Sequence, residues 1–221
     1  VLRGKELQSV INVMMGHQTF ATVRRQLQAA FPTELPWMHV IGHYIGEFWY
    51  RRHGLKAIGM CDTYYNHGCY HGVVQYAARV HGPDPDFLQK LYDACVTQKK
   101  SPEDCSDPLG HASATLTVFD MPKALALCER FFTTDKERTY CGLGVFMEYF
   151  NTYTDRIFPP NASADTLRQV CQAFPLFYQP GCVELSLSYI RNTYGYTFEE
   201  LMEHCQLFAD EPTQKRCYYG V

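Results

Sequence analysis

The sequence predicts an all-α fold, a right-handed α-solenoid of stacked helix pairs with about one disulfide per repeat. The ten cysteines fall into five close pairs in chain order, and the second cysteines of successive pairs lie 36, 36, 41 and 35 residues apart. A repeat period in the mid-thirties is typical of solenoids built from helix pairs. The alternation of apolar and polar residues that marks a half-buried strand does not continue beyond a few residues.

Each repeat is expected to contain a first helix, a short turn and a second helix. Amphipathic runs such as "MPKALALC" end at the first cysteine of a pair, and runs such as "CGLGVFMEYF" begin at the second. Asp120, Ser163 and Thr197 stand where helix N-caps are expected, and Gly54 and Gly82 stand at expected helix C-termini. These signals agree with the helix pairs that the cysteine spacing predicts.

The segment "VRRQLQAAFPTELPWMHVIGHYIGEF" fits one more helix pair that has no cysteines. The chain is therefore expected to form a single helical-repeat domain over residues 1–221, with roughly five to six helix pairs. Because the sequence starts at Val1, we expect it to be a fragment of a longer or processed chain.

The composition excludes several classes of protein. With 46% hydrophobic and 19% charged residues, the chain has the composition of a globular protein, not of a disordered one. The formal net charge of -3 gives no basic surface for nucleic acid. No apolar run reaches the roughly 18 residues of a membrane-spanning helix. We therefore expect no nucleic-acid partner and no transmembrane segment in this chain.

The unit "MPKALALCERFFTTDKERTYCGLGVFMEYF" resembles the cysteine-rich members of the Sel1-like repeats, a branch of the tetratricopeptide-like family. The resemblance covers most of residues 55–221, in pattern more than in identity. It implies a disulfide in each repeat between the end of the first helix and the start of the second, and a protein or peptide partner. The pairs expected are Cys61–Cys69, Cys95–Cys105, Cys128–Cys141, Cys171–Cys182 and Cys205–Cys217.

Disulfides form and persist in oxidising compartments. The protein is therefore expected to be secreted, periplasmic or lumenal. Asn161 begins a sequon in a proline-rich loop, and it is a candidate for glycosylation if the source is eukaryotic.

The second helices of three successive repeats carry pairs of candidate metal ligands four residues apart. These pairs are His39 and His43, His67 and His71, and Asp107 and His111. Residues at this spacing share one face of a helix, and helices stacked side by side bring such faces together. When the three helices are aligned, one column of equivalent positions contains His43, His71 and His111. The column one turn earlier contains His39, His67 and Asp107. The sequence thus predicts a multi-histidine metal site with these six ligands.

Several residues beside these pairs are small, among them Gly42, Gly68, Gly72 and Gly110. Each internal glycine costs a helix roughly 1 kcal/mol, so their recurrence beside histidine favours a site where helices approach closely. Imidazole ligands suit copper, zinc, iron or nickel. An oxidising compartment favours copper or zinc, with iron as a further candidate. Glu47, one turn after His43, is the candidate general base or proton shuttle.

Two functional interpretations follow. The first is an extracytoplasmic metal-binding repeat protein, in its catalytic form a copper- or zinc-dependent oxidoreductase. The second is a disulfide-stapled repeat module that binds a protein or peptide without catalysis. In the second, the histidines are a hydrogen-bonded ladder or tune binding with pH. Motifs of serine hydrolases, nucleotide-binding loops and HExxH metalloproteases are absent from the sequence.

Overall fold

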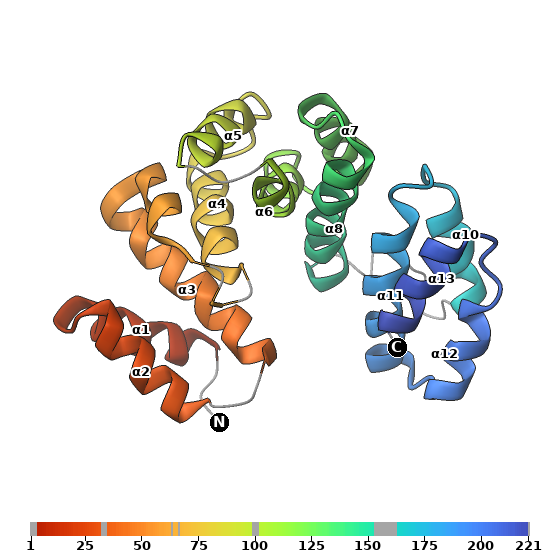
Figure 1. The fold of residues 1–221 in the computed structure, drawn as a ribbon, viewed down its shortest axis with the longest axis horizontal. Coiled ribbons are helices and arrows are strands. Elements are labelled where there is room, and N and C mark those ends of the chain that lie inside the picture. The colour runs from red at the N-terminus through yellow and green to blue at the C-terminus, as the bar shows by residue number, and fades with distance from the viewer. Residues whose placement is uncertain are drawn as a thin grey trace. The chain divides into compact units, whose positions relative to one another are not determined.

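A computed structural model of the chain describes residues 4–31, 35–62, 64–65, 67–98, 102–152 and 163–220. Over these residues it has twelve α-helices, one 3-10 helix and no strand, which confirms the all-α prediction (Figure 1). In chain order the helices are α1 (Gly4–His17), α2 (Phe20–Ala30), α3 (Leu35–His53), η1 (Gly54–Met60), α4 (Gly68–His81), α5 (Phe87–Thr97), α6 (Pro102–Leu116), α7 (Met121–Phe131), α8 (Asp135–Thr152), α10 (Ala164–Gln172), α11 (Gln179–Tyr194), α12 (Phe198–Cys205) and α13 (Glu211–Gly220).

The chain divides by its internal contacts into two compact units. Unit 1 comprises Val1–Gly82 and Gln89–Lys100, and unit 2 comprises Pro83–Leu88 and Ser101–Val221. The single domain over residues 1–221 stays a prediction, and Asn161 lies outside the described residues.

In unit 1, α2 and α3 are the two helices of the segment predicted as a helix pair without cysteines, and α1 packs against each of them. Helix α3 packs along α4, and the fully buried side chains of Ile11, Ile41, Ile45, Ile58 and Val73 form the core. The run before the first cysteine differs from the expected α-helix, because it forms the 3-10 helix η1. This 3-10 helix has seven residues and is long for its type, since runs of more than three to four residues are uncommon.

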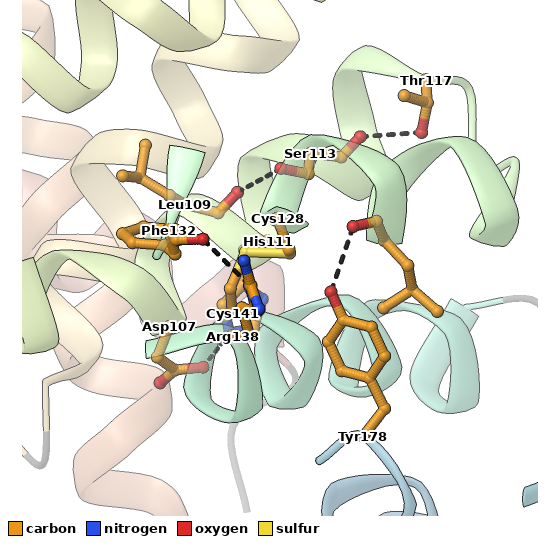
Figure 2. Close-up of a disulfide and its surroundings, with 11 residues drawn as sticks. Asp107, Leu109, His111, Ser113, Thr117, Cys128, Phe132, Arg138, Cys141 and Tyr178 are labelled. Atoms are coloured by element: carbon orange, nitrogen blue, oxygen red, sulfur yellow. Dashed lines mark hydrogen bonds and ion pairs between the residues drawn. A yellow bond between two sulfur atoms is a disulfide. The ribbon is translucent and has the colours of Figure 1, made fainter. Parts of the chain in front are cut away.

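In unit 2, the second helix of each repeat packs on the next: α6 on α8, α8 on α11, and α11 on α13 (Figure 1). The shorter helices α7, α10 and α12 pack beside them. The three predicted N-caps are confirmed, since Asp120, Ser163 and Thr197 each accept a hydrogen bond from the backbone N–H three residues on. Phe146 and Tyr178 are buried in the core, where the Tyr178 hydroxyl donates to the Leu125 carbonyl (Figure 2).

The disulfides follow the predicted register. Four of the predicted pairs are bonded, with Cα–Cα distances between 5.4 and 5.7 Å. Cys95 and Cys105 are also disulfide-bonded, and all ten cysteines, which lie in the described part of the chain, are oxidised. One detail of the prediction is corrected: the second helices begin before their cysteines, as α8 does at Asp135, ahead of Cys141.

Candidate metal centre

The backbones of α3 and α4 touch in unit 1 because glycines line their interface. A Cβ atom at Gly72 would collide with the carbonyl oxygen of His43, and one at Gly68 with that of His39. On the other helix, a Cβ atom at Gly46 would collide with the carbonyl oxygen of Cys69. No other residue fits these positions without moving a helix. The glycines thus bring the two helices close enough for their histidines to meet.

Three imidazoles converge at this interface, those of His39 and His43 from α3 and of His71 from α4. His39 Nε2 lies 3.0 Å from His43 Nε2 and 3.3 Å from His71 Nδ1. One ring nitrogen of each residue lies within 4.8 Å of the others. A tetrahedral zinc ion with Zn–N bonds of about 2.0–2.1 Å sets its nitrogens about 3.3 Å apart. This three-histidine cluster can therefore hold a metal ion with little rearrangement.

The environment of His43 favours ligation through Nε2. Its Nδ1 lies 3.3 Å from Oε1 of Gln75, one turn after His71 on α4, so the Nδ1–H is placed to donate to that oxygen. A donor bond from one ring nitrogen fixes the tautomer and leaves the other nitrogen with its lone pair. That nitrogen, Nε2, points to His39. Sequence reasoning missed Gln75, although its spacing of four residues from His71 was visible.

His67 does not join the three-histidine cluster. It stands before the first residue of α4, at the N-cap, with a φ of 62°. Its ring lies beside Tyr70, with a centroid distance of 5.9 Å. The expectation that His67 and His71 share a helix face is therefore wrong, because α4 begins only at Gly68.

Glu47 lies one turn further along α3 and is held by two arginines. Its side chain is almost buried, and it pairs with Arg51 of the same helix and, at 3.5 Å, with Arg79 of α4. The carboxylate thus links α3 to α4 beside the three-histidine cluster. Its charge also contributes, after burial, to the raised pKa of Tyr44. A role for Glu47 as proton shuttle stays a prediction.

The α6–α8 interface of unit 2 repeats the glycine contacts. A Cβ atom at Gly144 would collide with the carbonyl oxygen of Asp107, as one at Gly72 would with that of His43. The positions of the cysteines give the same alignment, because His71 and Asp107 each follow the second cysteine of their repeat by two residues. The predicted column is therefore wrong for unit 2: Asp107 takes the position of His43 and His71, and His111 lies one turn later.

His111 is buried in unit 2 between two carboxylates. Its Nδ1 lies 2.7 Å from Glu148 Oε1 on α8. Its Nε2 lies 3.8 Å from Oδ1 of Asp107 on α6, and Figure 2 labels both His111 and Asp107. Burial lowers the pKa of His111, but the hydrogen bond and charge of Glu148 and the charge of Asp107 outweigh it and raise the pKa overall. The sequence marked Glu148 only as a carboxylate in an otherwise apolar run.

Comparisons of the chain with models of known protein families, with curated proteins and with solved structures found no match. Within the described residues, no helix has the length and apolar character needed to cross a membrane. Functional inference therefore depends on the geometry of the two interfaces and on the disulfides.

Proposed function

We propose that the protein is an extracytoplasmic metal-binding protein in which His39, His43 and His71 bind one copper or zinc ion. The observation that carries this proposal is the convergence of three imidazole nitrogens from two helices. Three imidazoles form a ligand set that suits copper and zinc. The five disulfides support an oxidising compartment, in which ferrous iron is less suited.

A metal held by three imidazoles keeps a fourth position for water or substrate. In the catalytic form of the proposal, the protein is a metal-dependent oxidoreductase and Glu47 moves the proton. Its pairing with Arg51 and Arg79 fixes the position of the carboxylate one turn after His43. The scaffold in this proposal is a right-handed solenoid of Sel1-like repeats, which the stepwise packing of the second helices supports.

The alternative is a repeat module that binds a protein or peptide, and a pocket in unit 2 favours it. This pocket has a volume of 810 Å³, within the range of about 300–1,000 Å³ typical of ligand sites. Its apolar lining consists of Leu176, Phe177, Pro180, Pro212 and Tyr219. Leu176 and Tyr219 are well exposed, so an apolar peptide side chain can reach them.

Replacing His71 with alanine should remove one metal ion per chain. His71 is the ligand that α4 supplies to the three-histidine cluster, and its loss leaves two imidazoles from a single helix turn. His53 and His81 are exposed at helix C-termini, so H53A and H81A are matched controls that should keep the full metal content. The measurement is elemental analysis after supplementation with copper or zinc, with circular dichroism to confirm the helices.

Equal metal content in H71A and in both controls would contradict the proposal. So would an unmodified protein that binds no metal under supplementation. Either result would favour the pocket of unit 2 as the functional site.

Metal affinity at the three-histidine cluster should fall below about pH 6, because ligation requires deprotonated imidazoles and histidine titrates near pH 6.5. Up to three protons compete with one ion, so the fall should be steeper than for a single imidazole. Calorimetric titration with zinc from about pH 5 to pH 7.5 measures this, and the control variant H53A should show the same dependence on pH as the unmodified protein. An affinity independent of pH over this range would contradict imidazole ligation.

A further inference from the structure

We propose that unit 2 contains a second metal site, in which Asp107 and His111 of α6 bind a zinc ion and Glu148 of α8 positions His111. The site uses residues other than the three-histidine cluster, and its donors are one imidazole and one carboxylate.

The two ring nitrogens of His111 have different partners. Nδ1 is 2.7 Å from Glu148 Oε1, which places the Nδ1–H as donor to that carboxylate. His111 gives up the proton on Nε2 when it binds a metal, and Nε2 faces Asp107 Oδ1 at 3.8 Å. Two ligand atoms of one zinc ion lie about 3–4 Å apart, depending on the angle at the metal. Nε2 and Oδ1 are thus spaced to bind the same ion.

A carboxylate on one ring nitrogen and a metal on the other is the common arrangement around ligating histidines. Glu148 suits this role because the pair is out of water: His111 is 2% exposed and Glu148 is 8% exposed. In such surroundings, a charged hydrogen bond holds the ring orientation strongly. Glu148 is therefore a positioning residue that acts through His111.

The charges around His111 favour a divalent cation. Asp107 and Glu148 place two carboxylates beside one imidazole, and buried carboxylates require compensation. Glu184 of α11 adds to them: burial raises its pKa, Arg216 opposes this, and the charge of Asp107 raises it further. Arg216, 3.1 Å from Glu184, is the cation facing this group. A zinc ion at Asp107 and His111 would add positive charge beside these carboxylates.

The glycine contacts supply an independent argument. Gly144 gives room beside Asp107, since a Cβ atom there would lie 3.0 Å from Asp107 Oδ1. At the α3–α4 interface, Gly72 makes the corresponding contact with the backbone of His43. Both interfaces thus place a glycine of the later helix against the backbone of a candidate ligand residue of the earlier one. The mixed donors of unit 2 suit zinc, whereas three imidazoles also suit copper.

Zinc titration of the metal-free full chain tests the second site. The unmodified protein should bind two zinc ions, H43A and D107N should each bind one, and the double variant should bind none. D107N preserves the shape of the side chain, so its helices should remain intact by circular dichroism. If H43A binds two ions and D107N one, the three-histidine proposal fails and the second site stands.

Two outcomes would overturn the second site. One is a D107N variant that still binds two zinc ions. The other is an unmodified protein that binds a single ion, which H43A and D107N each abolish. The latter would leave metal binding as the function but remove the separate site.

The positioning role of Glu148 is tested by zinc affinity and by the visible absorption of cobalt bound in place of zinc. E148Q can still accept the Nδ1–H through its amide oxygen but loses the charge, so zinc affinity at this site should fall about tenfold, and in E148L about 100-fold. Cobalt bound in place of zinc should show shifted visible absorption in both variants, while the affinity of the three-histidine cluster stays unchanged. Unaltered affinity and spectra would overturn the positioning role, since a purely structural Glu148 would not affect them.

Discussion

Alanine at Gly110 is expected to lower the free energy of unfolding by about 3 kcal/mol, because overpacking at a tight helix contact is destabilising. The added Cβ would collide with the carbonyl oxygen of Cys141 and lie 3.0 Å from the Cα of Gly144. Both are backbone atoms that cannot rotate away, so α6 has to move from α8. Helix α8 cannot simply follow, since Cys141 is bonded to Cys128 of α7.

Gly16 provides the matched control. It also lies within a helix, but a Cβ atom there would meet its nearest neighbour, the Arg52 guanidinium, only at 3.9 Å. Alanine at Gly16 should therefore be neutral or stabilise the protein by up to about 1 kcal/mol, the helix-propensity difference. Urea denaturation of both variants measures the contrast. Equal stabilities would show that α6 and α8 are not in the close contact described.

The sequence was sufficient for the helix pairs and for the disulfides. Each predicted disulfide joins a cysteine at the end of one amphipathic run to a cysteine in the next run. A disulfide over so short a stretch of chain can be predicted from sequence spacing alone. The N-caps at Asp120, Ser163 and Thr197 were predictable for the same reason, since their hydrogen bonds span three residues. Helix α1 was not predicted, because it carries no cysteine or cap to mark it.

The register of the histidines was predictable only in part. A spacing of four residues is preserved when one helix slides by a turn past another, so His111 was aligned with His71 although Asp107 occupies that position. The contact of Gly144 with the Asp107 carbonyl fixes the register, and such a contact depends on three-dimensional packing. The partners of the histidines were missed for the same reason: Gln75 and Glu148 reach His43 and His111 across a helix interface.

Removing one member of the buried His111–Glu148 pair from the metal-free protein should lower the free energy of unfolding by about 3–5 kcal/mol, because it leaves the other buried polar group without compensation. We therefore expect a large loss in E148L and in H111L, measured by urea denaturation with a chelator at pH 7. In E148L, Asp107 does not replace the missing partner, since its nearest carboxylate oxygen is 3.8 Å from the ring. In H111L, Asp107 is a second carboxylate and cannot form an ion pair with Glu148.

The double variant E148L/H111L should be more stable than either single variant and close to the unmodified protein. Two leucines fill a similar volume without a desolvation cost, and apolar replacement of a buried ion pair is often neutral or stabilising. Additive losses would contradict a direct coupling between His111 and Glu148. In the coupled case the pair contributes little net stability to the fold. A double variant that folds as well as the unmodified protein, yet has lost one zinc ion, would therefore assign His111 to metal binding.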